Sequence, residues 1–295
     1  MKILIFGGNG FVGGNIAHSA KLAGWDVFIA DRETNNTTKD IEEEVIDIAN
    51  FEEVDELIKK IKPEVVVNTA AIADIDFAES EKEITARTNI TGAVNIAKAC
   101  AAGKIKYIFF SSDAVFDGRE DCYREDDIPK PVNYYGLTKA EAEKGIIREL
   151  SDYVILRISL VLGFPLERGN SFLASLMQKL KDKKIITVPI DIIRTPIDIS
   201  TLTKVVLELS LNKFSGILHI ACTEKVNRYD LACILGRKMG YPTDRILPGS
   251  SENGTSGKAI RHKNGILNIS KAERILKTRM PDLNETVESA LKTLL

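Results

Sequence analysis

The stretch that decides the fold is KILIFGGNGFVG, residues 2–13. A short, mostly apolar run, Lys2–Phe6, leads directly into glycines at Gly7, Gly10 and Gly13, and a helical pattern follows. In a dinucleotide-binding loop the first glycine allows a tight turn, the second lets backbone N–H groups approach a pyrophosphate, and the third lets the helix pack on the strand. The alternative is a glycine turn with a purely structural role. We expect phosphate binding at the helix N-terminus by Gly7, Gly10, Phe11, Val12 and Gly13.

Short apolar runs alternate with longer helical patterns through the first half of the chain. The runs are apolar on both faces, as strands buried between two helix layers are. Strands that alternate with helices form right-handed βαβ units. The sequence therefore predicts an α/β fold with a Rossmann-type, doubly wound parallel sheet. The predicted strands are 2–6, 25–30, 64–68, 105–111 and 153–158, and the predicted helices are 12–23, 51–61, 81–102 and 133–150.

The pattern changes after about residue 160, where glycine and proline interrupt the chain. Amphipathic segments then surround one strand-like run at 216–221. We predict an NAD(P)-binding Rossmann domain at residues 1–160 and a smaller C-terminal α/β lobe at 161–295 that binds substrate, with the two allowed to interleave. Ligands of open α/β sheets bind outside the carboxyl ends of the strands. The second lobe is therefore expected over that edge.

The overall composition excludes several classes of protein. The chain has 295 residues, with 40 Lys+Arg against 42 Asp+Glu and a formal net charge of -2. Binders of nucleic acid or anionic membranes need an excess of basic residues, so neither partner is expected. No apolar run reaches the roughly 18 residues of a membrane span, and the run before Gly7 is too short for a signal peptide. The Cys and His residues show no metal-binding spacing, which predicts a reduced, cytoplasmic protein without a metal site.

Asp31 ends the second predicted strand. A carboxylate at this position accepts hydrogen bonds from the adenosine ribose hydroxyls and repels a 2′-phosphate. The sequence therefore favours NAD(H) over NADP(H), although the adjacent Arg32 offsets part of the repulsion and keeps NADP(H) open. The alternative is a solvated charge at a strand end.

A second set of residues points to proton transfer. Tyr135 and Lys139 are four positions apart at the start of a helical pattern, so they share one helix face. A lysine ammonium beside a phenol favours the phenolate and lowers its pKa, which would prepare Tyr135 to exchange a proton near neutral pH. Ser112 follows the fourth predicted strand, where its hydroxyl can meet a carbonyl oxygen beside the tyrosine.

Together these motifs resemble the extended short-chain dehydrogenases/reductases and, more narrowly, the dTDP-4-dehydrorhamnose reductase family. The resemblance covers nearly the whole chain, and its most specific segment is Ser111–Gly118. The other matching stretches are the glycine loop, Asp47-Ile48, Val67–Ala71, Asp76 to Glu79, Tyr135–Lys139, Leu156-Arg157, Gly169–Phe172, Thr195-Pro196 and Gly216–Ile220.

The resemblance implies an NAD(P)-dependent enzyme and a role for individual residues. It makes Ser112 the hydroxyl that hydrogen-bonds the substrate carbonyl and Tyr135 the proton donor. It makes Lys139 the residue that binds the nicotinamide ribose and tunes the tyrosine. Further roles are implied for Asp47 and Ile48 at the adenine, Ala70 and Ala71 along the cofactor, and Asn89 in support of the proton relay. The implied activity is reduction of a keto sugar, most specifically a 4-keto nucleotide sugar, by a protein that can form a homodimer.

Two positions depart from the family pattern. Ala114 stands where the family usually has tyrosine, and Leu160 stands where it usually has tryptophan. Both aromatic rings would face the sugar, so we expect a substrate other than dTDP-4-dehydrorhamnose. A sugar with an added substituent would fill the vacated volume, and a pocket closed by a neighbouring loop is the alternative.

Three other functions remain open on the same scaffold. A 4,6-dehydratase carries Asp-Glu after the Ser or Thr, whereas Ala114 follows Asp113 here and the base is missing. An epimerase generally lacks the aspartate. A cofactor-binding regulatory subunit without turnover, as the methionine adenosyltransferase beta subunit is, is disfavoured by the intact catalytic set.

Two charged runs carry no assigned chemistry. The acidic run Glu42–Glu44 is interpreted as a solvated face. The basic run Arg261–Lys263 either meets a pyrophosphate or is solvated.

Overall fold

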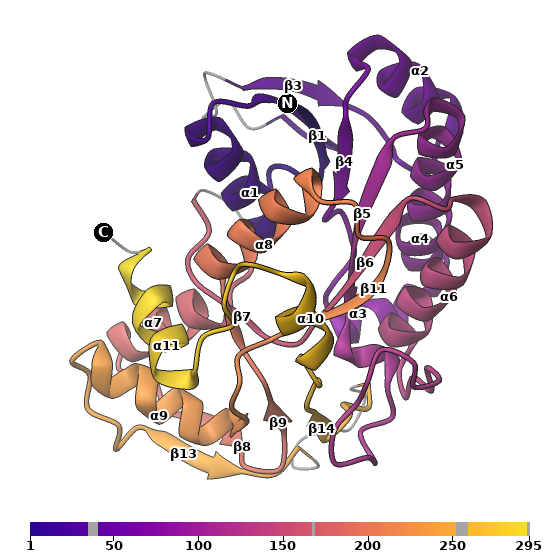
Figure 1. Cartoon of the computed structure of the whole chain (residues 1–295). Coiled ribbons are helices and arrows are strands. Elements are labelled where there is room, and N and C mark those ends of the chain that lie inside the picture. Colours follow the sequence, from indigo (N-terminus) through magenta and orange to yellow (C-terminus); the bar gives the residue numbers. More distant parts are fainter. Residues whose placement is uncertain (35–40, 167–168, 252–258, 294–295) are drawn as a thin grey trace.

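A seven-stranded parallel sheet lies at the centre of the computed structural model, which describes residues 1–34, 41–166, 169–251 and 259–293. Helices cover both faces of the sheet (Figure 1). The strand order is β11-β6-β5-β4-β1-β2-β3, which confirms the predicted doubly wound fold. The strands are β1 Lys2–Phe6, β2 Asp26–Asp31, β3 Glu42–Val45, β4 Val65–Asn68, β5 Lys106–Ser112, β6 Tyr153–Ile158 and β11 Gly216–Ile220.

The direction of the strand order reverses at β1. From β1 the chain moves outward through β2 and β3, and it then returns to place β4 on the other side of β1. Val65, Val66 and Val67 are completely buried, because β4 has strands on both sides and helices on both faces. A reversal of this kind leaves a crevice at the carboxyl ends of the strands, where ligands of such sheets bind.

Two helix layers enclose the sheet. On one face lie α1 (Phe11–Leu22) and α8 (Ile199–Leu211), which pack on each other. On the other face lie α2 (Phe51–Ile61), α5 (Ala93–Gly103) and α6 (Tyr134–Glu149). Figure 1 shows these two groups on opposite sides of the strands. Each layer therefore buries its own apolar core against the sheet.

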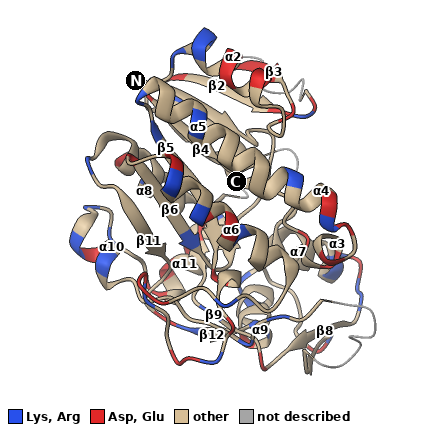
Figure 2. Cartoon of the chain, turned by 90° about the vertical axis from the view of Figure 1, so that its right-hand side faces the viewer, with Lys and Arg blue, Asp and Glu red and all other residues tan. Residues whose placement is uncertain are grey.

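The first half differs from the sequence prediction in two places. The acidic run Glu42–Glu44 is part of β3, the edge strand beside β2, and is only half exposed. Charged residues suit an edge strand because they discourage pairing with another chain, and Figure 2 shows β3 and α2 marked by acidic residues. The predicted helix at 81–102 is interrupted: α4 (Lys82–Ala86), a π-helical turn (Arg87–Gly92) and α5 follow one another.

A second lobe is built from short sheets and helices. Its sheets pair β8 with β13, β7 with β10, and β9 with both β12 and β14. Its own apolar core lies among three helices, α7, α9 and α11. The elements are β7 Val161–Leu162, α7 Phe172–Lys181, β8 Ile186–Pro189, β9 Ile193–Arg194, β10 Ile197–Asp198, β12 Val226–Asn227, α9 Arg228–Lys238, β13 Ile246–Gly249, β14 Asn264–Gly265 and α11 Leu283–Lys292. The helix α10 (Ser270–Ile275) packs instead on β11 and the core of the first lobe.

The chain does not stay in the second lobe after residue 160. It returns to the first lobe for α8, which packs on α1, and for β11, which pairs in parallel with β6. The division at residue 160 remains a prediction, and α8 and β11 lie on the first-lobe side of it in space. No helix in the described residues is both long enough and apolar enough to span a bilayer.

A late segment, residues 259–268, crosses back over the first lobe; we call it the strap. Asp76 accepts a hydrogen bond from the backbone N–H of Ala259 at 3.0 Å, and the amide of Asn133 donates to the Ile260 carbonyl at 2.8 Å. Further along, the Tyr123 N–H donates to the carbonyl of Ile266 at 2.9 Å. The strap therefore holds the loop between β5 and α6 in place.

Candidate functional site

The glycine loop forms an open cradle for an anion. Gly7 has a φ of +78°, and a Cβ at Gly13 would collide with the Gly7 carbonyl oxygen and the Thr69 side chain. The Gly10 N–H donates to the Gly7 carbonyl at 3.1 Å. The first residue of α1 follows Gly10, which has no side chain to cap the helix, so the N–H groups of the first turn are available to a ligand. This cradle fits the pyrophosphate of a dinucleotide.

A cavity of about 180 Å³ adjoins the loop at the carboxyl ends of β1, β2 and β4. It brings together predicted cofactor residues from four separate stretches of chain. Four residues without a predicted role, Ala30, Ile46, Thr69 and Thr88, complete the wall. Thr69 stands within the matched stretch 67–71, so its neighbours Ala70 and Ala71 signalled it. The predicted residues that line the cavity are Gly7, Gly10, Asp31, Arg32, Ile48, Ala70 and Ala71.

Asp31 both lines this cavity and braces the glycine loop. Its carboxylate accepts hydrogen bonds from the backbone N–H of Asn9 at 3.1 Å and of Arg32 at 2.8 Å. The Arg32 side chain is exposed at the same edge. These two hydrogen bonds fix the carboxylate in the wall of the cavity.

Asp47 has a different environment from its neighbour Ile48. Its carboxylate accepts from the Arg87 guanidinium at 2.7 Å and from the Ala49 N–H at 2.9 Å. Ile48 is buried and lines the cavity. The implied adenine contact of Asp47 therefore stays a prediction, and the carboxylate also anchors the π-helical turn that contains Arg87.

Asn89 lies in that π-helical turn and is almost completely buried. Its side chain accepts from the Ile72 N–H at 2.8 Å and donates to the Ile72 carbonyl at 3.0 Å. Its amide also donates to the Thr138 hydroxyl at 3.1 Å. These contacts hold the loop after β4 against α6, so Asn89 positions the backbone that carries Ala71 relative to the helix that carries Lys139. π-Helical turns often occur at functional sites.

Ser112, Tyr135 and Lys139 converge at the carboxyl end of β5. Ser112 is the last residue of β5, and Tyr135 lies in the first turn of α6. The helix begins there because the Asn133 side chain accepts a hydrogen bond from the Gly136 N–H at 2.8 Å. The Lys139 ammonium lies one turn further on, 5.9 Å from the centroid of the Tyr135 ring.

The pKa of Tyr135 moves in the opposite direction from the expected one. Burial raises it to about 12, and an interaction with the Ser112 side chain offsets only part of the shift. The expected lowering by Lys139 is not found, since burial dominates the shift; the ammonium itself donates to the carbonyl of Phe110 at 2.8 Å. Burial lowers the pKa of Lys139 itself to about 8. A protonated phenol at neutral pH suits a proton donor.

A buried ion pair lies beneath Lys139. Arg157 on β6 donates to the two carboxylate oxygens of Glu143 on α6, at 3.0 Å and 2.7 Å, and both residues are at most 2% exposed. The Ser111 hydroxyl donates to the same carboxylate at 2.5 Å. This network ties α6 to β5 and β6 and so fixes the helix that carries Tyr135 and Lys139.

Asp113 collects partners from distant parts of the chain. Its Oδ2 accepts from the Ser159 hydroxyl at 2.7 Å and lies 3.2 Å from both Arg194 Nε and His262 Nε2. Its Oδ1 accepts from the Ser112 hydroxyl at 3.1 Å. Burial favours the neutral acid, but the charges of His262 and Arg194 outweigh that effect and hold the pKa of Asp113 well below its usual range. The sequence analysis missed Arg194, although it directly precedes the matched Thr195-Pro196.

The basic run 261–263 is buried only at His262, whereas Arg261 is partly exposed and Lys263 is exposed. Arg261 pairs with Asp76, and His262 is buried against Asp113. Lys263 Nζ lies 3.6 Å from an Asp191 carboxylate oxygen. All three side chains hold the strap on its neighbours.

The two positions that depart from the family pattern are packed. Ala114 is 2% exposed, and its carbonyl lies directly against Gly136 on α6. Leu160 packs against the core of the second lobe. Whether the sugar site is widened or closed at these positions stays a prediction.

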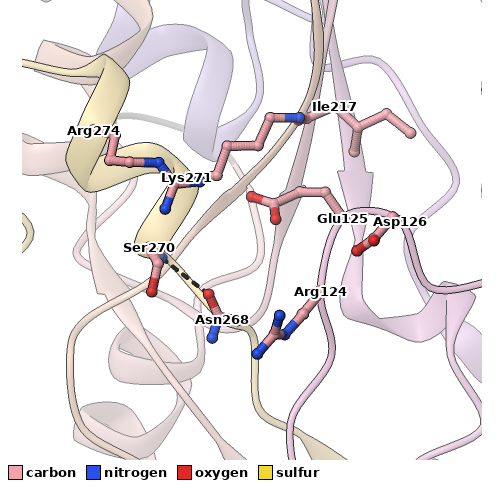
Figure 3. Close-up of a pocket in the computed structure, with 8 residues that line it drawn as sticks. All are labelled: Arg124, Glu125, Asp126, Ile217, Asn268, Ser270, Lys271 and Arg274. Carbon is pink, nitrogen blue, oxygen red and sulfur yellow. Dashed lines mark hydrogen bonds between the residues drawn. The ribbon is translucent and has the colours of Figure 1, made fainter.

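A separate hollow of about 640 Å³ lies beside β11 and contains no predicted site residue. Figure 3 shows its charged side chains, contributed by α10 and by the loop after β5. Lys271 donates to the Ile217 carbonyl at 2.7 Å, and Glu125 accepts from the His219 N–H at 3.1 Å. These side chains are engaged in holding β11 at the edge of the sheet.

The parallel sheet, the glycine cradle and the Ser-Tyr-Lys set define an extended short-chain dehydrogenase/reductase. The chain belongs to the RmlD substrate binding domain family, whose model matches residues 1–295. It is 29% identical to dTDP-4-dehydrorhamnose reductase of Escherichia coli (strain K12), over 100% of this chain and 98% of that protein. It is also 29% identical to methionine adenosyltransferase 2 subunit beta of Xenopus laevis, over 79% of this chain and 71% of that protein.

A solved structure shows the same architecture. The dTDP-4-dehydrorhamnose reductase of Bacillus anthracis str. Ames, in complex with NADP, matches with a TM-score of 0.89 and 25% identity over 99% of both chains.

Proposed function

We propose that the chain is an NAD(P)H-dependent reductase of a keto sugar, with a 4-keto nucleotide sugar as the substrate class. The proposal rests chiefly on the convergence of Ser112, Tyr135 and Lys139 beside the dinucleotide cradle. The full-length similarity to dTDP-4-dehydrorhamnose reductases supports it.

In this proposal each residue has a distinct task. A bound nicotinamide supplies the hydride. The Ser112 hydroxyl hydrogen-bonds the substrate carbonyl oxygen, and Tyr135 donates the phenolic proton to that oxygen. Lys139 binds the nicotinamide ribose. Because burial keeps Tyr135 protonated at neutral pH, the proton is present before the substrate enters.

The cofactor is held by the cradle and the adjoining cavity. Gly7, Gly10 and the first turn of α1, Phe11, Val12 and Gly13, take the pyrophosphate, and Asp31 takes the adenosine ribose. The fixed carboxylate of Asp31 favours NAD(H), and the exposed Arg32 allows NADP(H) as a second cofactor. Ile48 and the Ala70-Ala71 pair form the apolar wall.

Turnover tests the function directly. The purified chain is mixed with NADH or NADPH and a panel of 4-keto nucleotide sugars, including dTDP-4-dehydrorhamnose, and cofactor oxidation is measured against sugar alcohol formed. We expect one-to-one stoichiometry at an ordinary enzymatic rate, on the order of 1–10³ per second, with at least one member. Product without net cofactor oxidation would indicate an epimerase or dehydratase. Binding without any product would indicate a regulatory subunit.

A homodimer, a cytoplasmic location and the lack of a nucleic-acid partner stay proposals. The four cysteines are free, which suits a reducing compartment. Light scattering after gel filtration tests the oligomeric state.

A further inference from the structure

Within the described ranges, Arg228 is a cation without a counter-ion beside the proposed reaction centre. It is the first residue of α9, and its guanidinium lies over the ring of Phe172, 4.1 Å from the centroid. Among the described residues its side chain has no hydrogen bond and no ion pair. A cation–π contact of this kind uses none of the guanidinium N–H groups as hydrogen-bond donors, so they are left for a ligand.

The neighbouring Arg194 cannot serve the same purpose. Its Nη1 donates to the carbonyls of Ile193 at 2.7 Å and Lys263 at 3.2 Å, and its Nη2 donates to the His262 carbonyl at 3.1 Å. Its Nε faces Asp113. The donors of Arg194 are therefore committed to the strap, and its charge is balanced by Asp113.

Charge balance at this point leaves Arg228 uncompensated. The negative charge of Asp113 favours the protonated form of Arg228. However, Arg194 already pairs with that carboxylate. Burial and the charge of Arg194 lower the pKa of Arg228 to about 10. A partly buried cation that lacks a partner is costly, and an anionic ligand would remove that cost.

The position of Arg228 is on the route a substrate would take. Phe172 follows Gly169, where a Cβ would lie 2.6 Å from the Phe11 nitrogen in the first turn of α1. On the other side, β12 pairs with β9, which carries Arg194 toward Asp113 and Ser112. The chain on either side of Arg228 and Phe172 thus adjoins both the glycine loop, through Gly169, and the strand that carries Arg194 to Asp113.

We propose that Arg228 binds an anionic oxygen group of the substrate, a phosphate or a carboxylate, and thereby selects which nucleotide sugar occupies the site. The inference rests on the proposed function for the identity of the substrate class. It adds a specificity residue outside the catalytic set. The anion would be the sugar-proximal phosphate or a carboxylate on the sugar itself.

Calorimetric titration of the full chain with saturating NAD tests the assignment without turnover. The probes are UDP-glucose, UDP-glucuronate and dTDP-glucose. Arg228→Gln is expected to bind weaker than wild type by roughly 10- to 100-fold, because charge-assisted hydrogen bonds are lost. Equal weakening for UDP-glucose and UDP-glucuronate identifies the phosphate as the ligand group. Weakening for UDP-glucuronate alone identifies the carboxylate.

Two variants serve as controls. Arg237→Gln makes the same charge change at an exposed position of α9 and should bind all probes as wild type does. Arg228→Lys keeps the charge but loses the fork of donors, so its affinity should be intermediate. In the absence of probes, Arg228→Gln should unfold at the same temperature as wild type or a higher one, whereas a purely structural role predicts a lower one.

Equal binding by Arg228→Gln and wild type, or no binding of any probe to wild type, would overturn the inference. Failure of the proposed function has a different signature. In that case the probes bind in the Arg228-dependent manner, but no keto sugar is reduced.

Discussion

The cofactor side and the substrate side of the site differ in how far apart their parts lie in the sequence. The cavity at the glycine loop is lined by residues that directly follow the strands β1, β2 and β4. Asp113, in contrast, meets Ser159, Arg194 and His262, which come from the ends of unrelated elements.

This difference separates cofactor binding, which the sheet topology provides in general, from the choice of a particular substrate. A crevice at the ends of parallel strands follows from the topology of the sheet itself. The substrate side depends on packing between two lobes and the strap, so a few substitutions there can change the ligand while the cofactor side is retained. Variants that affect only one side therefore test the separation.

The largest expected effect is on the turnover rate, without a change in cofactor affinity. Tyr135→Phe keeps the ring and removes the proton, so turnover should fall by about 10²–10⁴-fold while NADH affinity stays unchanged. Tyr134→Phe alters the adjacent phenol on the same helix and should keep full activity. Steady-state rates and cofactor titration measure both. Full activity of Tyr135→Phe would remove the tyrosine from the mechanism.

The free energy of unfolding should depend strongly on Arg194, which lies on the substrate side. Arg194→Met leaves Asp113 buried with less compensation, which should cost about 3–5 kcal/mol of unfolding free energy. The partly exposed pair of Arg261 and Asp76 is the matched comparison, and Arg261→Met should cost only about 0–1 kcal/mol. Urea unfolding measures both values. Equal losses would mean that the two strap contacts are energetically alike.

NADH affinity should depend on the absence of a side chain at Gly13 but not at its neighbour Gly14. Gly13→Ala places a methyl group against the Gly7 carbonyl, so NADH affinity should fall by about 10- to 100-fold. A Cβ at Gly14 would lie 3.3 Å from the Gly8 carbonyl oxygen, and Ala is favoured in a helix. Gly14→Ala should therefore bind NADH normally. Normal binding by Gly13→Ala would contradict the close approach at the loop.

A smaller effect concerns the edge strand β11 and depends on pH. Burial, assisted by the charge of Arg157, lowers the pKa of His219 from 6.5 to about 3. Between these values the unfolded chain binds a proton that the folded chain does not, so stability falls as pH decreases. His219→Gln should flatten that decline by about 1.4 kcal/mol per pH unit. Urea unfolding at several pH values tests this, and an unchanged slope in His219→Gln would contradict the prediction.

The smallest effect should be on the choice of cofactor. Asp31→Ala removes a carboxylate that opposes a 2′-phosphate, so the preference for NADH over NADPH should fall by about 3- to 10-fold. Arg32→Ala should shift the preference in the opposite direction. Fluorescence titration with both cofactors gives the ratios. A wild-type protein that binds NADPH more tightly would overturn the preference itself.

The sequence predicts the cofactor side well because its signals are local. Buried parallel strands are continuous apolar runs, and the glycines stand directly between β1 and α1. β3 lacks that signal because Glu42–Glu44 form an edge strand that the sheet does not bury on both faces. The π-helical turn at Arg87–Gly92 depends on tertiary contacts of Asn89 and Asp47, and periodicity does not reveal it.

The environment of the catalytic set was harder to predict. The spacing of Tyr135 and Lys139 gives the shared helix face but not the direction of the ammonium, which the Phe110 carbonyl determines. The partners of Asp113 are separated from it by long stretches of chain, so no local pattern relates Arg194 or His262 to it. The role of Ala114 also depended on packing, since only the fold shows that α6 covers it.

The strap has a consequence for the order of events during synthesis. Elements near the N-terminus leave the ribosome first and fold as units. The glycine loop and the strands that line the cofactor cavity emerge well before residues 259–268, which complete the surroundings of Asp113. A nascent chain is therefore ready to hold a dinucleotide while its substrate side is still open, and bound cofactor would stabilise that partly made protein.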